Sequence, residues 1–170
     1  MPAHPDLERL YDDHAQALFA FLLNFTRDEN DTRDLLQEIF IKLARQSGLL
    51  EAARDHRAFL IRLAHNAAVD LIRRRRSRDR HHERFSAEQD CMFVSSTDPD
   101  EAAFRTELSV ALGQLPPDQR AVVHLKLWEG FTFAEIAVTL DIPQNTAASR
   151  YRYGLDKLRE LLRPLHEALK

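Results

Sequence analysis

Apolar residues recur at intervals of three and four along most of this chain, which is the spacing of a helix that buries one face. We expect helices over about residues 7–23, 35–47, 58–76, 104–115, 118–130, 132–140 and 144–162, with Gly130 as the C-cap of the fifth. No run alternates with a period of two over a length sufficient for a strand. The pattern therefore predicts an all-α fold.

Polar breaks divide these helices into two groups. A polar segment at residues 28–31 separates the first two helices. Residues 77–100 lose the helical period and fill with serine, aspartate, arginine and histidine, which is typical of a linker. Pro116 and Pro117 end a later helix, because proline removes a backbone donor. We predict two small helical domains, over residues 1–80 and 101–170, joined by a flexible linker over 81–100.

The C-terminal part has the pattern of a helix-turn-helix. Thr132 and Glu135 have the spacing of a capping box, in which each side chain accepts a hydrogen bond from the other residue's backbone amide. Asp141, Ile142 and Pro143 break the chain after a short helix, and a longer helix follows. In such a motif the second helix lies in the major groove of DNA. An ordinary helical hairpin with a polar outer face is the alternative.

The longer helix has two distinct faces. Its predicted packing face consists of Ala147, Tyr151, Gly154, Leu155, Leu158 and Leu161. Its outer face carries side chains that can donate to phosphates or read base edges. These are Asn145, Thr146, Ser149, Arg150, Arg152 and Tyr153.

The net charge of −3 over 170 residues conceals a strong partition. Residues 1–53 carry 5 basic and 10 acidic side chains, whereas residues 54–84 carry 10 basic and 4 acidic ones. Residues 85–118 carry 1 basic and 7 acidic side chains, and residues 119–170 carry 8 and 6. Two basic segments around an acidic one indicate two surfaces for a polyanion. Solvated surface charge remains the simpler explanation of any single run.

The basic segment contains four consecutive arginines, Arg73 to Arg76, at the end of the third predicted helix. Such a cluster binds a phosphate backbone without sequence preference. One turn earlier, four polar side chains are expected on the side opposite the leucines: Arg62, His65, Asn66 and Asp70. Asn66 can both donate to and accept from an unpaired base, and Asp70 is expected to orient Arg73 and Arg74. A plain surface histidine explains His65 equally well.

The second predicted helix carries a further polar face, distinct from its leucines. This face consists of Asp34, Gln37, Glu38 and Lys42. By itself, a stripe of solvated surface side chains would explain this face. The order in which all these features occur along the chain argues against that explanation.

Four segments together resemble the bacterial RNA polymerase sigma factors of the extracytoplasmic-function group, in the sigma-70 family. The segment DLLQEIFIKL at residues 34–43 resembles conserved region 2, and residues 59–70 with their arginine tail look like the helix for promoter melting and −10 reading. Residues 115–120 and 129–137 resemble the start of region 4, and residues 143–150 its −35-reading helix. The motifs cover nearly the whole chain outside residues 77–100, and their order and spacing make the resemblance specific.

This resemblance implies a dissociable subunit of RNA polymerase without catalytic activity, cofactor or metal. The implied core polymerase-binding residues, which would dock on the clamp of the largest subunit, are Asp34, Gln37, Glu38 and Ile41. The implied −10 DNA-binding residues are Arg62, Asn66, Arg73, Arg74, Arg75 and Arg76. The implied −35 DNA-binding residues are Asn145, Thr146, Ser149, Arg150, Arg152 and Tyr153, in a region 4 that also docks on the polymerase flap. An anti-sigma factor is implied as a further partner.

The chain departs from the family pattern at a few positions. Asn145 stands where the family often has glycine, and asparagine tolerates the left-handed backbone conformation. Ala148 and Tyr153 stand where basic residues are frequent, so we expect −35 readout to depend on Arg150, Arg152 and Ser149. Phe59 replaces a frequent tryptophan before the −10 helix, and its stacking is expected to be weaker.

Two other functions compete with this one. A stand-alone helix-turn-helix transcriptional regulator would bind duplex DNA without polymerase and would not support initiation. A metal-dependent enzyme would have to use His56, His65, His81, His82 and Cys91, whose spacing matches no common metal motif. The N-terminus lacks the order of a signal peptide, and no segment is apolar enough to insert into a membrane, so a cytoplasmic protein is expected.

Overall fold

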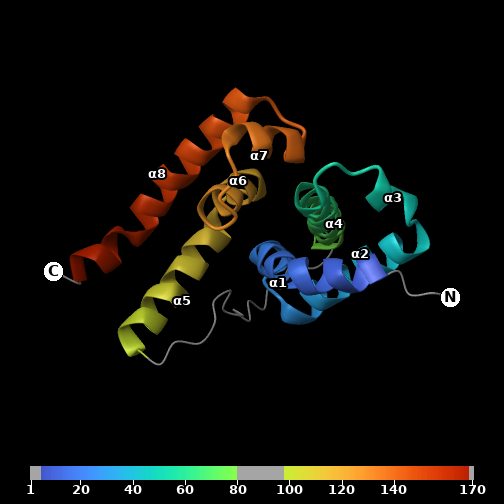
Figure 1. Cartoon of the computed structure of the whole chain (residues 1–170). Coiled ribbons are helices and arrows are strands. Elements are labelled where there is room, and N and C mark those ends of the chain that lie inside the picture. Colours follow the sequence, from blue (N-terminus) through green and yellow to red (C-terminus); the bar gives the residue numbers. More distant parts are fainter. Residues whose placement is uncertain (1–4, 80–97, 169–170) are drawn as a thin grey trace. The chain divides into compact units, whose positions relative to one another are not determined.

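The computed structural model describes residues 5–79 and 98–168, and every regular element in these two ranges is a helix (Figure 1). The chain divides into two compact units, Met1–Ala87 and Glu88–Lys170. The predicted all-α fold is confirmed. None of the described helices is both long enough and apolar enough to cross a membrane.

The first unit contains α1 (Pro5–Thr26), α2 (Glu29–Arg45), α3 (Gly48–Glu51) and α4 (His56–Asp79). α1 packs against α2 and α4, and α2 also contacts α4. The shared core contains the nearly inaccessible side chains of Leu18, Phe21, Leu22, Leu43, Leu60 and Ile61. Burying each such side chain contributes about 1.5–3 kcal/mol, so these residues fix how the three long helices sit on one another.

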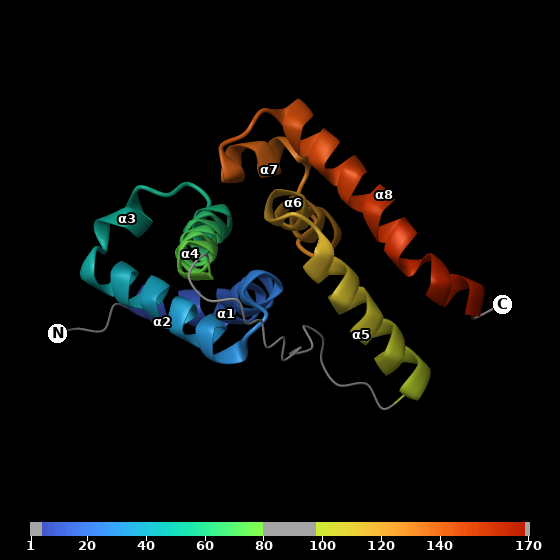
Figure 2. The ribbon, with the colours of Figure 1, turned by 180° about the vertical axis from the view of Figure 1, so that it is seen from behind.

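The second unit contains α5 (Pro99–Gln114), α6 (Pro117–Leu127), α7 (Phe133–Leu140) and α8 (Gln144–Ala168). α8 contacts the other three helices, and Figure 2 shows it lying along α5 and α6. The core of the second unit is a cluster of buried residues from α5 and its C-cap, α6 and α8: Ala111, Leu112, Leu115, Val123 and Leu158. The long helix is therefore held along much of its length.

The polar segment at residues 28–31, predicted to be a break, is mostly the first turn of α2. Asp28 is the N-cap, and its carboxylate accepts a hydrogen bond from the Asp31 amide at 2.9 Å. Glu29 and Asp31 lie in the first turn, where acidic side chains interact favourably with the helix dipole. The break itself is confined to Arg27 and Asp28, with Arg27 at a left-handed φ of 56°.

The segment 77–100, which lacks the apolar helical period and was interpreted as a linker, is helical at both of its ends. α4 continues through its polar, exposed end to Asp79. α5 begins at Pro99, capped by the Asp98 carboxylate, which accepts from the Asp100 amide at 3.0 Å. Both ends are helical without an apolar period, because capping and helix propensity suffice there. Residues 80–97, which include most of the predicted linker, lie outside the described residues.

Two further helix ends differ from expectation, and one short helix was not predicted. α6 ends at Leu127 with Trp128 as its C-cap, so Gly130 does not cap it directly, although Gly130 does adopt a left-handed φ of 66°. α8 continues to Ala168, past Pro164. The short helix α3 begins directly after Ser47, where the second helix was predicted to stop. No apolar period predicted this short helix.

Candidate nucleic-acid interfaces

The basic end of α4 comprises Arg73, Arg74, Arg75 and Arg76. The side chain of Arg73 is 77% exposed, and its Nη1 lies 4.0 Å from the Asp70 carboxylate. Arg74 donates from Nε to the Asp70 carbonyl at 3.3 Å. Arg74 and Arg76 are also exposed, so three guanidinium groups are accessible to a phosphate backbone. The predicted contact of the Asp70 carboxylate is therefore confirmed for Arg73, whereas Arg74 donates to the Asp70 backbone carbonyl.

Arg75 differs from its neighbours because its guanidinium is directed into the first unit. Nη1 donates to the Thr26 carbonyl at 3.3 Å, and Nη2 forms an ion pair with the Asp31 carboxylate. These partners lie at the end of α1 and in the first turn of α2. Sequence reasoning assigned Arg75 to the same surface as the other three arginines and missed Asp31 altogether.

The preceding turns of α4 present Arg62 and Asn66 to solvent. His65 was predicted to project from the same side, and that prediction was wrong. The His65 ring is partly buried and packs edge-to-face on Phe25, with the ring centroids 6.0 Å apart. His65 therefore helps to hold α4 on α1.

The predicted polymerase-binding residues of α2 lie on one exposed surface. Asp34, Gln37, Glu38 and Ile41 are all exposed, Ile41 to 42%. The apolar residues of the same helix, Leu35, Leu36, Ile39, Phe40 and Leu43, are buried. The predicted separation of the two faces is confirmed, and an exposed isoleucine among acidic and amide side chains is available to a partner.

In the second unit, α7 and α8 form the two helices of the predicted helix-turn-helix. The capping box is present: the Glu135 amide donates to Thr132 Oγ1 at 3.2 Å, and the Thr132 amide donates to Glu135 Oε2 at 2.7 Å. Thr132 therefore begins α7 as predicted.

The turn between α7 and α8 uses Asp141, not Asn145, as its left-handed residue. Asp141 has φ 55° and ψ 53° at the C-cap of α7, and the following Ile142 amide donates to the Ala137 carbonyl at 3.0 Å. Asn145 lies inside the first turn of α8 with a helical backbone. The left-handed conformation expected at Asn145 is therefore wrong. Asp141, a short polar residue directly after the last residue of α7, adopts it instead and ends that helix.

The packing face of α8 is confirmed. Ala147, Gly154 and Leu158 are buried, and Tyr151, Leu155 and Leu161 pack partly buried against the core. Gly154 permits a close approach to α6, because a Cβ at this position would lie 2.7 Å from Cγ2 of Val123. The N-terminal half of α8 is thus set in register against α6.

The predicted −35 residues differ in how they are held. Asn145, Arg152 and Tyr153 are exposed, whereas Thr146, Ser149 and Arg150 are partly buried. The Ser149 hydroxyl donates to the Asn145 carbonyl at 2.8 Å. Arg152 lies over the ring of Tyr153, 5.1 Å from the centroid. The outer face therefore combines a cation, an aromatic ring and short polar groups.

Arg150 makes a contact that sequence reasoning missed. Its Nη2 lies 3.4 Å from the Asp118 carboxylate of α6. Asp118 occupies the first turn of α6, where an acidic side chain is favourable in itself, so nothing in the local pattern pointed to α8. The ion pair holds the Arg150 side chain next to the start of α6.

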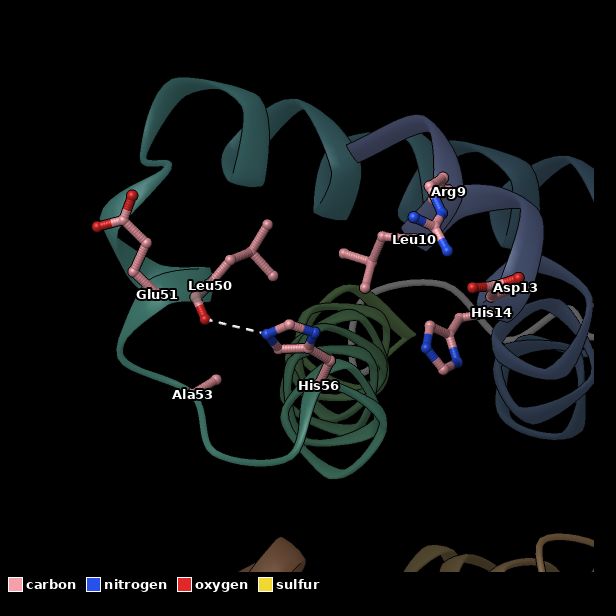
Figure 3. A pocket seen from close by; sticks show the side chains of 8 residues that line it. All are labelled: Arg9, Leu10, Asp13, His14, Leu50, Glu51, Ala53 and His56. Carbon is pink, nitrogen blue, oxygen red and sulfur yellow. Dashed lines mark hydrogen bonds between the residues drawn. The ribbon is translucent and has the colours of Figure 1, made fainter. Parts of the chain in front are cut away.

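A cleft of about 420 Å³ lies between α1, α3 and the start of α4 (Figure 3). Its lining is mixed: Arg9, Leu10, Asp13, His14, Leu50, Glu51, Ala53 and His56. His56 Nε2 lies 3.2 Å from the Leu50 carbonyl. The cleft contains none of the residues predicted to bind polymerase or DNA. Among the described residues, no group of three His, Cys, Asp or Glu side chains is arranged to hold a metal ion, and His81, His82 and Cys91 lie outside them.

Two family models match the chain. The model "Sigma-70 region 2" matches residues 10–78, and the model "Sigma-70, region 4" matches residues 111–160. The first match spans the α2 face and the whole basic end of α4, and the second spans the helix-turn-helix.

Several curated proteins are similar over most of this chain. It is 34% identical over 162 residues to the RNA polymerase sigma factor CarQ of Myxococcus xanthus, covering 94% of this chain and 91% of that protein. It is 30% identical over 165 residues to the ECF RNA polymerase sigma factor SigX of Bacillus subtilis, covering 94% and 85%. A solved structure, the sigma factor RpoE in complex with the anti-sigma factor NepR from Bartonella quintana, has a similar fold. The TM-score is 0.76, the identity 21%, and the coverage 93% of this chain and 97% of that one.

Proposed function

Because the chain belongs to the sigma-70 family of RNA polymerase sigma factors, in the extracytoplasmic-function group, we propose that it binds core RNA polymerase and directs initiation at specific promoters. Region 4 reads the −35 element, and region 2 reads and helps to open the −10 element. The relatives are initiation factors and not enzymes, and we assign no catalytic residue to this chain. Its place of action is the bacterial cytoplasm, where the polymerase and the promoter are.

The observation that carries the proposal is the pairing of two exposed surfaces in the first unit. The α2 face carries Ile41 among polar side chains, and α4 carries Asn66 followed by exposed arginines. A regulator that acts alone on duplex DNA needs neither surface. A protein that docks on polymerase and captures an opened strand needs both.

In this proposal, the α2 face docks on the clamp of the largest polymerase subunit. Exchanging Ile41 for arginine places a charge in the centre of that face, so Ile41→Arg should lose binding to purified core polymerase. A helix surface substitution leaves the buried side of α2 unchanged, so the melting temperature of the chain should hold. Wild-type affinity of Ile41→Arg for core would remove the α2 face from the proposal.

Asn66 supplies the complementary test on α4. An exposed amide can donate and accept, which suits an unpaired base. Asn66→Ala should slow promoter opening, measured by permanganate reactivity of the −10 thymines, and should leave core binding intact. Asn30→Ala, which removes an exposed asparagine from α2, is the matched control and should do neither. If Asn66→Ala instead lost core binding and opened the promoter normally, the assignment of α4 would be wrong.

The −35 element is assigned to the outer face of α8. Arginine pairs with guanine through two hydrogen bonds in the major groove, worth about 1–3 kcal/mol of discrimination. Arg152 and Tyr153, both exposed, and Ser149 complete the surface. Region 4 also docks on the polymerase flap in this proposal. An anti-sigma factor, of the kind bound to the Bartonella quintana protein, is proposed as the partner that holds the chain inactive.

A further inference from the structure

Arg75 makes a forked contact with two helices of the first unit. One end of its guanidinium donates to the Thr26 carbonyl at the end of α1, and the other forms the ion pair with Asp31 of α2. The Thr26 carbonyl belongs to the last turn of α1, whose carbonyls lack partners within the helix. Arg75 therefore ties the end of α4 to the point where α1 meets α2.

The turn between α1 and α2 that Arg75 contacts is itself held by hydrogen bonds. The hydroxyls of Thr26 and Thr32 lie 2.6 Å apart, and Thr32 donates to the Asp28 carbonyl at 2.8 Å. Thr26 and Thr32 are both buried. Asp28 caps α2 through the backbone amide of Asp31, the residue whose side chain holds Arg75. The ion pair thus attaches α4 to a preorganised polar corner and not to a mobile loop.

The geometry of Arg75 distinguishes it from the other arginines of the run. Its side chain is 42% exposed, against 77% for Arg73. An exposed pair alone contributes little, but here both terminal nitrogens are engaged across two elements. Successive residues of a helix point about 100° apart, so the inward direction of Arg75 leaves Arg74 and Arg76 outward.

We infer that Arg75 is a positioning residue and not a strand contact: it fixes the basic end of α4 relative to α2, so that Arg73, Arg74 and Arg76 meet the DNA strand. Asp31 is its functional partner. The consequence for promoter opening rests on the proposed function. It also links the two surfaces of the first unit, since Asp31 lies one turn before the α2 face that begins at Asp34.

The first test uses the free full-length chain and needs no polymerase. Arg75→Ala and Asp31→Ala should each speed amide hydrogen exchange of residues 73–79 by roughly 3- to 10-fold, the scale of an interaction between contacting residues. Arg74→Ala and Glu29→Ala are the matched controls, since they remove a neighbouring arginine and a neighbouring acidic residue. Neither control substitution should change the amide hydrogen exchange of residues 73–79.

The second test uses the reconstituted complex with core polymerase and a single-stranded 20-mer of thymidylate, with core alone as the blank. If Arg75 touched the strand, Asp31→Ala would release it and remove a negative charge, so binding would tighten or stay the same. A positioning role predicts the opposite sign. Asp31→Ala should weaken binding as much as Arg75→Ala does, and the double variant should be no weaker than either single one.

Three results would overturn the inference. One is unchanged or tighter binding of the single strand by the Asp31→Ala complex. Another is a loss of strand binding in the double variant that equals the sum of the two single losses. Faster exchange spread evenly over α1, α2 and α4 is the third, because the contact would then support the whole unit and not the end of α4. If the wild-type complex failed to bind the strand, the proposed function would fail, while the exchange experiment would still judge Arg75.

Discussion

From the close approach of α8 to α6 at Gly154 we predict an effect of Gly154→Ala on stability, and a second substitution at Val123 should reverse the sign of that effect. A Cβ at residue 154 would lie 2.7 Å from Cγ2 of Val123, well inside the 3.5–4.0 Å of a normal carbon contact. Val123 is fully buried and β-branched, so its χ1 is restricted and the methyl group cannot turn aside. The contact therefore has to be relieved by movement of a helix.

Two opposing terms set the magnitude for Gly154→Ala. Overpacking a buried site costs about 1–3 kcal/mol. Replacing glycine by alanine inside a helix stabilises the helix by about 0.8–1 kcal/mol. We expect a net destabilisation of about 1 kcal/mol in the wild-type background. In a Val123→Ala background the methyl group is gone, so the same substitution should stabilise by about 1 kcal/mol.

The assay is urea unfolding followed by tryptophan fluorescence. Trp128 is the single tryptophan of the chain and lies at the end of α6, so its signal reports the second unit. Four proteins complete the cycle: the wild type, the two single variants and the double variant. Stabilisation by Gly154→Ala in the wild-type background, or an equal effect in both backgrounds, would refute the packing of α8 on α6 described above.

Three further changes have defined outcomes in the same unit. Thr132→Ala should lower its free energy of unfolding by about 1 kcal/mol through loss of the capping box, whereas Thr106→Ala, at an exposed mid-helix hydroxyl, should cost much less. Arg120→Met should cost about 2 kcal/mol or more, because the buried guanidinium donates to two backbone carbonyls at 2.8 Å that would lose their donor. Asp118→Ala should leave stability nearly unchanged but reduce −35 discrimination in a competition binding assay, because Arg150 loses its orienting carboxylate; equal discrimination would remove that role.

The helices and their buried faces could be predicted because burial imposes a period on the sequence. Leu35, Ile39 and Leu43 repeat at helical spacing and are buried, and Ala147 and Leu158 behave in the same way on α8. The capping box could be predicted because Thr132 and Glu135 contact each other within one turn. Local chemistry of this kind does not depend on the rest of the fold.

Helix ends were less predictable, because the apolar period reports burial and not helicity. The polar pattern at Glu29 and Asp31 predicted a break between helices, although acidic residues are favourable in the first turn of a helix. Asn145 was chosen as the left-handed residue by comparison with a family pattern, whereas the chain reverses four residues earlier at Asp141. A turn can move by several residues when another side chain tolerates the conformation.

The partners of Arg75 and Arg150, which lie far away in the sequence, could not be predicted. Arg75 and Asp31 are 44 residues apart, and Arg150 and Asp118 are 32 apart on different helices. Arg75 stands in a run of exposed arginines, and Arg150 stands on a polar helix face, so the sequence assigned both of them to DNA. Only the packing of the helices shows which cations are already engaged.

The most direct measurement is run-off transcription from linear duplex DNA carrying the region upstream of the chain's own gene, with purified core polymerase. We expect a discrete transcript when the full-length chain is added to core and none from core alone. We also expect that Asn66→Ala reduces that transcript while Asn30→Ala does not. A chain that binds the duplex without polymerase and yields no transcript at any genomic promoter would contradict the account and favour a stand-alone regulator.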